Sequence, residues 1–338
     1  MAQVTVHRPL VPVHGPLAPG RRRGIVAAAL TGLLVLAGCA PQDGAASTTS
    51  PSAAAPVTAA TPAASASTTA TASSAPAPGS APAVASGIPG CAPSDIRTVK
   101  SGTLTLATSQ PAFEPWIVGN DPTTGNGFES AVAYAAASAL GHARTQVSWT
   151  RVDFNAAVQP GRKAFDADIN QFSITEGRRT AVDFSSSYYA VPQAVIVRSD
   201  ALPAQRTIEA LKGLQLGAQV GTTSYTAITS QIQPGKPPRT YNDNSAAGQA
   251  LSNGQIQGLV VDLPTALYLA AAELKGVEVF GQLPASGATP DKLAFVLDKG
   301  SPVTACLSKA VDQLRADGTL TKLATRWLTA SAGAPVLR

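Results

Sequence analysis

Between residues 101 and 328, apolar and polar positions alternate in patterns that predict a succession of strands and helices. Leu104 and Leu106 alternate with threonines, which is typical of a strand with one buried face, whereas 128–140 has apolar residues at helical spacing. We expect further strands at 146–150, 194–198, 214–219, 259–262, 277–280 and 293–297. Further helices are expected at 207–212, 222–232, 245–253, 264–274, 302–317 and 320–328. This order predicts an α/β fold with largely parallel sheets, in which a ligand crevice lies at the carboxyl ends of the strands.

The N-terminal part of the chain has three consecutive arginines, Arg21–Arg23, followed by an apolar run. The uncharged stretch 24–38 is too short to cross a bilayer but suits the core of a secretory signal. It ends in Leu-Ala-Gly-Cys at 36–39, which resembles the lipobox of bacterial lipoproteins. We therefore expect 1–38 to be a lipoprotein signal peptide and Cys39 to carry the lipid. An ordinary signal peptide with an incidental cysteine is the alternative, and the export route and the start codon stay open.

Residues 39–90 follow as a segment of Ala, Ser, Thr, Pro and Gly that has almost no other residue type. Asp43 is its only charge, and it has no aromatic residue. Such a composition cannot bury enough apolar surface to offset the entropy of ordering, so we expect a disordered tether. A flexible chain of this length spans about 40 Å on average. The folded part is then expected to start at about residue 91.

Charge and histidine content exclude several classes of function. The formal net charge is +5, but it falls to +1 once the four arginines of the expected signal peptide are removed. A nearly neutral body lacks the basic surface that nucleic-acid binding requires. Two of the three histidines also lie in the leader, which leaves His142 alone. Hydrolases with a histidine base and zinc sites with several imidazoles are therefore disfavoured, and we expect no metal and no cofactor.

The two cysteines that remain after lipidation, Cys91 and Cys306, most simply form one disulfide in an exported protein. This bond would close a loop of more than 200 residues. A redox-active or metal-binding pair is the alternative, but the Cys-x-x-Cys spacing that such pairs often have is missing.

Eight short segments, in fixed order, resemble the extracytoplasmic solute-binding proteins of polar amino acid ABC importers, bacterial solute-binding protein family 3. They lie at 102–108, 127–129, 152–154, 172–178, 182–189, 216–223, 260–262 and 316–319. The resemblance implies a two-lobed periplasmic-binding-protein-like fold of type II, in which each lobe is a mostly parallel sheet flanked by helices. Lobe 1 would comprise 91–190 and 288–338, and lobe 2 would comprise 191–287. Hinge crossings are expected near 190–193 and 284–288, with both cysteines in lobe 1.

The resemblance also implies residues for the two charged poles of an amino acid. Arg178 is expected to bind the carboxylate, because its planar fork makes two parallel charge-assisted bonds. Ser173 and Thr223 would add hydroxyl groups, Thr175 would cap the helix that carries Arg178, and Asp262 would accept the ammonium. Simpler interpretations stay open: a solvated arginine, a threonine that is only a helix residue, and an aspartate that caps the helix expected at 264.

For the side chain of the ligand, the resemblance points to aromatic and amide groups. Phe113 and Phe154 align with aromatic positions that sandwich the ligand in related proteins, although each could instead belong to the core. Trp116 could line the cleft or pack the lobe. Many relatives have an acid shortly before the first aromatic residue, where this chain has neutral residues instead: Ser109, Gln110 and Pro111. Neutral amides are expected nearby, at Asn170, Gln171 and Gln219. Together these residues favour a polar, uncharged amino acid.

The resemblance thus implies a monomeric, lipid-anchored subunit on the outer face of the bacterial cytoplasmic membrane. It would capture an amino acid by lobe closure and present it to an ABC permease. Two alternatives stay open. One is a dehydratase-type enzyme on the same fold, for which Glu114 is the evident extra acid near the cleft, while His142 follows a helix away from it. The other is a ligand sensor that does not take part in transport.

Overall fold

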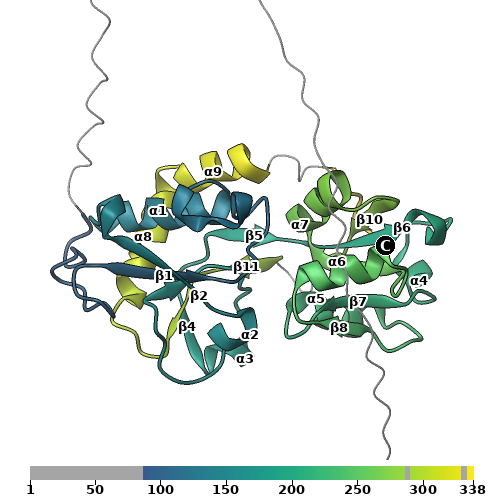
Figure 1. Ribbon diagram of the computed structural model, residues 1–338, viewed down its shortest axis with the longest axis horizontal. Helices are drawn as coiled ribbons and strands as arrows, with labels where there is room; N and C mark the ends of the chain where they lie inside the picture. Colours follow the sequence, from purple (N-terminus) through teal and green to yellow (C-terminus); the bar gives the residue numbers. More distant parts are fainter. Residues whose placement is uncertain (1–86, 286–289, 329–332) are drawn as a thin grey trace, which may run out of the picture. The chain divides into compact units, whose positions relative to one another are not determined.

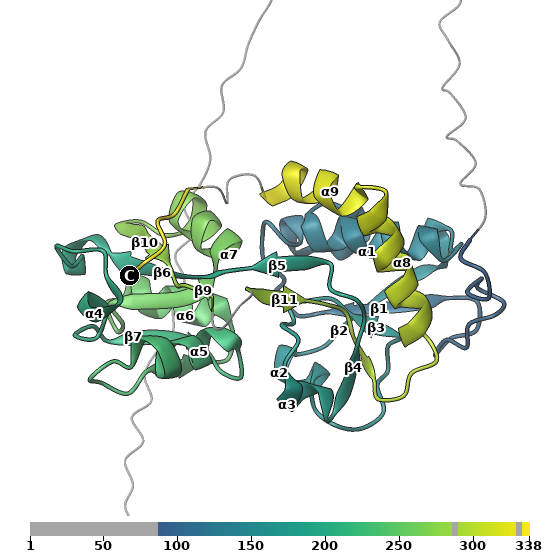
Figure 2. The same cartoon turned by 180° about the vertical axis from the view of Figure 1, so that it is seen from behind.

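The computed structural model describes residues 87–285, 290–328 and 333–338, all of which belong to one compact unit. The expected signal peptide, Cys39 and most of the expected tether lie outside these described residues. The described chain forms two five-stranded sheets and a two-stranded ribbon (Figures 1 and 2). We call the part that holds the first sheet lobe 1 and the part that holds the second sheet lobe 2. Among the described residues, no helix combines the length and apolarity that a membrane crossing requires.

Lobe 1 is built on a sheet with the strand order β2-β1-β3-β12-β4. Its strands are β1 (Leu104–Thr108), β2 (Val147–Arg151), β3 (Ala167–Asp168), β4 (Val182–Phe184) and β12 (Val296–Asp298). One core joins β1 to the helices α1 (Phe128–Ala139), α8 (Thr304–Ala316) and α9 (Thr319–Leu328). A smaller apolar cluster includes Phe154 of α2 (Phe154–Ala157), and the short helix α3 (Glu176–Arg179) precedes β4. The sheet is therefore covered by apolar residues on both faces.

Lobe 2 has a sheet with the strand order β10-β6-β9-β7-β8. Its strands are β6 (Gln193–Arg198), β7 (Leu216–Gln219), β8 (Arg239–Tyr241), β9 (Gly258–Asp262) and β10 (Val277–Gln282). Its α-helices are α4 (Ile208–Leu211), α5 (Thr223–Ala227), α6 (Asn244–Ser252) and α7 (Leu263–Tyr268). Helices α5 and α7 each continue into a π-helical turn, at Ile228–Ile232 and Leu269–Glu273. Two apolar clusters flank the sheet, one with α4 and α5 and the other with α6 and α7.

The strand directions agree with the expectation of mostly parallel sheets. In lobe 1 only β12 runs opposite to the other four strands of its sheet, and in lobe 2 only β6 does so. Each of these two strands directly follows a passage between the lobes. Strand β5 (Tyr189–Val191) leads through Pro192 into β6, and it pairs antiparallel with β11 (Asp291–Leu293), which precedes β12. In each sheet, the strand that directly follows a passage is therefore the one that runs antiparallel to the others.

The end of the chain differs from the expected division, which assigned all of 288–338 to lobe 1. Val336 forms a parallel bridge with Gln282 of β10, and Leu337 belongs to an apolar cluster of lobe 2. Gly281 explains this contact, because a Cβ at that position would lie 2.5 Å from a methyl carbon of Leu337. Residues 333–338 therefore pack on lobe 2, where the lack of a side chain at Gly281 leaves space for Leu337.

The expected disulfide is confirmed. Cys91 is bonded to Cys306 of α8, with the two Cα atoms 5.5 Å apart. Both residues are buried in the lobe 1 core. The bond therefore fixes the start of the described chain to a helix near its end.

Candidate functional site

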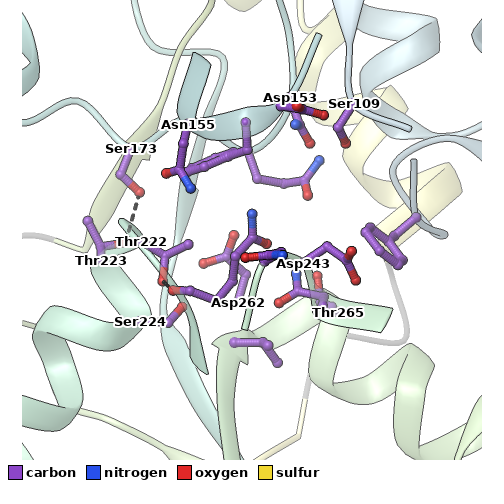
Figure 3. A pocket seen from close by; sticks show the side chains of 18 of the residues that line it. Ser109, Asp153, Asn155, Ser173, Thr222, Thr223, Ser224, Asp243, Asp262 and Thr265 are labelled. Atoms are coloured by element: carbon purple, nitrogen blue, oxygen red, sulfur yellow. Dashed lines mark hydrogen bonds between the residues drawn. The ribbon is translucent and has the colours of Figure 1, made fainter. Parts of the chain in front are cut away.

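A cavity of about 400 Å³ is lined by residues of both lobes (Figure 3). Its walls come from the ends of six strands. In lobe 1 the lining follows β1, β2 and β3, and in lobe 2 it follows β7, β8 and β9. Carboxyl ends of parallel strands are where α/β folds place their ligand crevices, because loops and helix N-termini gather there. The cavity therefore lies where the fold class predicts a binding site.

All the residues that the sequence analysis expects to contact a ligand line this cavity. They are Phe113, Phe154, Gln171, Ser173, Arg178, Gln219, Thr223 and Asp262. Their contacts with a ligand stay a prediction. The cavity also includes the neutral stretch expected near the first aromatic residue, namely Ser109, Gln110 and Pro111. The structure thus gathers side chains that are up to 153 positions apart in the sequence.

Arg178 is held in place by neighbours on both lobes. Helix α3 begins after Thr175, whose hydroxyl accepts the Arg178 N–H at 3.2 Å, so the expected cap is confirmed. The guanidinium donates to the carbonyl oxygens of Ser173, at 2.7 Å, and of Gly221, at 3.0 Å. Burial lowers the pKa of Arg178 to about 10, although Asp291 and Asp262 oppose this shift. The group therefore stays cationic at neutral pH, and both of its acceptors are uncharged.

Asp262 ends β9 and precedes α7, but its carboxylate does not cap that helix. The capping alternative is therefore wrong. Oδ1 of Asp262 instead accepts from Nε2 of Gln193 at 2.7 Å. Burial is the main cause that raises the pKa of Asp262 to about 7; the nearby Asp291 and Glu129 act in the same direction, while Gln193 and Arg178 act against it. Near neutral pH, Asp262 is thus poised between its neutral and its charged form.

Hydroxyl groups from the two lobes meet beside this pair. Oγ of Ser173 lies 3.2 Å from Oγ1 of Thr223, as the dashed line in Figure 3 marks. Thr223 is the first residue of α5, and the hydroxyl of Thr222 caps this helix by accepting from the N–H of Tyr225 at 3.2 Å. Just before it, Gly221 has a φ of 76°, and a Cβ there would lie 2.3 Å from Oδ1 of Asn155. Only glycine allows this close approach of the lobes.

The aromatic residues have separate roles. Phe154 stacks on Phe172 with ring centroids 4.7 Å apart, so one ring serves both the apolar cluster and the cavity wall. Phe113 is half-buried at the wall. Trp116 is fully buried in the lobe 1 core and does not line the cavity. Its indole N–H donates across to Oγ1 of Thr265 in lobe 2, at 2.8 Å. Trp116 therefore packs the lobe and also contacts the opposite one.

One of the expected amides, that of Gln171, is already engaged. Gln171 has a left-handed backbone, with a φ of 47°, and its backbone and side-chain N–H groups both donate to the carboxylate of Glu129. Glu129 is fully buried in α1, and burial raises its pKa to about 7. For Gln219 it is the backbone carbonyl, and not the side-chain amide, that accepts from the hydroxyl of Thr222 at 2.7 Å. Gln171 thus lines the cavity wall and is held in position by hydrogen bonds to the buried Glu129.

The sequence analysis missed two carboxylates at the cavity. Asp153 and Asp243 both line it, and Figure 3 shows Asp153 beside Ser109 on one wall with Asp243 on the facing wall. Asp243 accepts from the N–H of Ala246 at 2.8 Å and so caps α6, whereas Asp153 is exposed. Each follows the end of a strand, which is the signal that could have identified them. Glu114, the acid considered for an enzyme, does not line the cavity and accepts from the N–H of Gly119 at 3.1 Å.

Comparison with known proteins places this geometry in a family. The family model of the bacterial extracellular solute-binding proteins, family 3, matches residues 104–330. The L-cystine-binding protein TcyJ of Escherichia coli (strain K12) is 27% identical over 230 residues, which cover 68% of this chain and 84% of that protein. Among solved structures, an ancestral arginine-binding protein bound to glutamine has a TM-score of 0.56 and 28% identity, and the match covers 67% of this chain and 97% of that one. The ancestral amino acid-binding protein AncCDT-1, described as a precursor of cyclohexadienyl dehydratase, has a TM-score of 0.55 and 27% identity, with 67% and 95% covered.

Proposed function

Because the chain belongs to the bacterial extracellular solute-binding proteins of family 3, we propose that it captures a free amino acid for an ABC importer. One observation carries this proposal: a guanidinium from lobe 1, Arg178, and a carboxylate from lobe 2, Asp262, line the same cavity. A free amino acid has a carboxylate and an ammonium on one carbon. Removing both charges from water is costly unless each meets an opposite charge.

Arg178 is suited to the carboxylate of the ligand. Its two side-chain bonds go to neutral carbonyl oxygens, so its charge is available to an anion, with which it would form stronger charge-assisted bonds. The hydroxyls of Ser173 and Thr223 lie next to each other and would donate to the same carboxylate. Asp262 would accept the ammonium from the facing lobe. The pair would thus select for the zwitterion and against simple carboxylic acids.

Closure of the lobes would bury the ligand. Three direct contacts already join lobe 1 to lobe 2: Arg178 to the Gly221 carbonyl, Ser173 to Thr223, and Trp116 to Thr265. Opening the cleft would break them, and a ligand held by both lobes would favour the closed form. A membrane permease that recognises the closed form would then receive only the loaded protein. A sensor would use the same closure, and neighbouring permease and ATPase genes would distinguish an importer subunit from it.

We propose that the side chain of the amino acid is polar and uncharged. A cationic side chain would need a carboxylate that is shielded from water. Asp153 is exposed, and Asp243 already accepts a backbone N–H as a helix cap, so neither provides such a partner. Neutral groups dominate the rest of the wall, among them Gln110, Asn155 and Asn170. An ancestral arginine-binding relative was solved with glutamine as well as with arginine, so a binding site of this fold can accept an amide side chain.

The proposed location is the outer face of the bacterial cytoplasmic membrane, where a lipid on Cys39 would anchor a monomer through the tether 40–90. Cys39 and nearly all of this tether lie outside the described residues, so the proposal depends on the sequence. Metabolic labelling with palmitate tests it. The label is expected on the exported wild type and not on a Cys39→Ser variant.

A thermal-shift screen of the purified protein tests the binding function. The twenty common L-amino acids are compared with their counterparts that lack the α-ammonium group. At least one L-amino acid is expected to raise the melting temperature, since a ligand at 100 times its Kd stabilises the folded state by about 2.7 kcal/mol. Its counterpart without the ammonium should give little or no shift. If no amino acid raises the melting temperature, the proposal is wrong.

A further inference from the structure

Gln193 lies behind the cavity, where the chain first passes from lobe 1 to lobe 2. It is the first residue of β6, only 7% exposed, and it is not part of the cavity lining. Its Cα partner across the β6–β9 pair is Asp262. Its carbonyl oxygen accepts from the N–H of Leu283 at 2.8 Å, just after the end of β10. Gln193 therefore adjoins the expected ammonium-binding acid, the passage that leads into β6 and the segment that follows β10.

The side-chain amide of Gln193 has one favourable orientation. Its Oε1 accepts from the hydroxyl of Ser224 at 2.6 Å, while its Nε2 donates to Asp262 at 2.7 Å and to Asp291 at 3.2 Å. Turning the amide around would bring its oxygen against two carboxylates, which have no hydrogen to share when ionised. The amide therefore points its N–H groups at the two acids, and it ties β9 to the first residue of β11.

We propose that Gln193 is a positioning residue for the ligand ammonium, which acts by orienting the Asp262 carboxylate and by keeping it ionised against the nearby Asp291. This inference rests on the proposed function. It assigns a role in binding to a residue that the ligand would not contact.

Charge explains how Gln193 would act. Asp262 has a pKa of about 7, which burial and the neighbouring acids raise and the N–H of Gln193 lowers. The titratable and charged groups that face Asp262 are Asp291 of β11, Glu129 of α1, Arg178 of α3, Tyr188 just before β5, and Tyr189 of β5. A protonated Asp262 cannot pair with an ammonium. Loss of the Gln193 N–H would favour the protonated form, and loss of the Asp291 charge would favour the ionised form.

Two substitutions should therefore move the titration of Asp262 in opposite directions. Gln193→Met keeps the length of the side chain but removes the N–H donor, and Asp291→Asn removes the competing charge. Gln282→Met is the matched control: Gln282 ends the neighbouring strand β10, and its amide donates only to the backbone carbonyl of Ala334, at 2.6 Å. It changes a glutamine of the same sheet without touching either acid.

The first measurement needs no ligand. Carbon-13 NMR of protein labelled at its aspartate carboxyl groups follows the titration of Asp262, which is assigned by its absence in Asp262→Asn. The midpoint is expected to rise by about one pH unit in Gln193→Met and to fall by about as much in Asp291→Asn. Gln282→Met should match the wild type. A midpoint that is unchanged in Gln193→Met would overturn the inference.

The second measurement uses calorimetry with whichever of the twenty L-amino acids gives the largest thermal shift. Gln193→Met is expected to weaken binding about fivefold at pH 7 and hardly at all at pH 9, where Asp262 is ionised in both proteins. An equal loss at both pH values would mean that Gln193 is only a packing residue, and the inference would be wrong.

If the wild type binds none of the twenty amino acids, the proposed function fails and this inference fails with it. If the wild type binds and the midpoint does not move, only this inference fails.

Discussion

Lobe 1 and lobe 2 share an arrangement of strands but bury different kinds of polar side chain. In each sheet one of five strands runs against the other four, and in each lobe the cavity wall follows three strand ends. Lobe 1 buries ionisable groups: Glu129, His142, Asp166 and Asp168. The fully buried polar groups of lobe 2 are neutral: Gln193, Gln219, Ser224 and Thr265. Buried acids therefore make the stability of lobe 1 depend on pH, whereas lobe 2 uses a buried neutral amide to orient Asp262, one of its two half-buried cavity acids.

Two aspartates of lobe 1 show what burial costs. Asp166 accepts the N–H groups of Val99 and Thr105, each at 2.7 Å, so both of its oxygens are satisfied. Asp168, two residues later, is fully buried on β3 between Ala107 and Val296, and neither of its oxygens has a hydrogen-bond partner. Burial raises the pKa of Asp168 well above its usual range, and Glu129 raises it further. A charged Asp168 is thus strongly disfavoured in the folded protein.

The largest expected effect concerns the disulfide, which only lobe 1 has. Replacing Cys91 and Cys306 together by alanine should lower the free energy of unfolding by up to about 5 kcal/mol, because the bond closes a separation of 215 residues. All three tryptophans lie in lobe 1, at 116, 149 and 327, so their fluorescence in a urea titration reports on that lobe. Fluorescence midpoints that coincide for the variant and the wild type would contradict this prediction.

The next largest effect concerns Arg178, the cation on the lobe 1 wall of the cavity. Arg178→Ala should weaken binding of the amino acid found in the screen by about 100-fold or more, because the ligand carboxylate would lose a buried counter-charge. The unfolding free energy of the ligand-free protein should change by no more than about 1 kcal/mol. Arg179→Ala is the matched control, since Arg179 is exposed, does not line the cavity, and interacts with the exposed Glu176, at 3.5 Å, and with the ring of Phe184. Calorimetry that gives both variants the affinity of the wild type would remove Arg178 from the site.

Longer elements of the fold could be predicted from the sequence because they show periodicity. Every expected helix is present, but the strand expected at 293–297 is divided between β11 and β12. Strands β3, β4, β5 and β8 were missed. Each has only two or three residues, too few for a pattern, and their pairing is decided by distant partners. Missing β8 also concealed Asp243, which follows it closely.

Eight of the residues that line the cavity were found through the family resemblance, whereas Gln193 behind it was not. Gln193 bonds to Asp262 and Asp291, which are 69 and 98 positions away. A glutamine after a proline has no local feature that indicates such partners. Likewise, the sequence of 333–338 does not indicate that this segment packs on lobe 2. Its position depends on the space that Gly281 leaves for Leu337. Contacts of this kind become visible only when the chain is folded.

A third, smaller effect tests the cost of ionisable groups in lobe 1. Asp168→Val should stabilise the protein by about 1–3 kcal/mol at pH 8, because an apolar side chain suits the cluster around β3. The pKa of Asp168 is raised in the folded state, so the wild type loses stability as the pH rises above the unfolded value near 4. The gain should therefore shrink towards pH 4. Urea denaturation at both pH values measures it, and a gain that is larger at pH 4 would contradict the sign.

The smallest expected effect tests whether lobe 2 supports the contact from Trp116. Thr265→Val keeps the shape of the side chain but removes the oxygen that accepts the indole N–H, which would leave a fully buried donor without a partner. We expect a loss of about 1 kcal/mol in unfolding free energy. Because this bond joins the lobes, the closed form should lose stability as well, and affinity for the amino acid found in the screen should fall by about threefold.

Trp116→Phe tests the same bond from lobe 1, because it removes the indole N–H that donates to Thr265. In a double-mutant cycle, the two substitutions together should cost clearly less than the sum of their separate effects. Additive costs would mean that the bond does not couple the lobes, and closure would then depend on the contacts of Arg178 and Ser173.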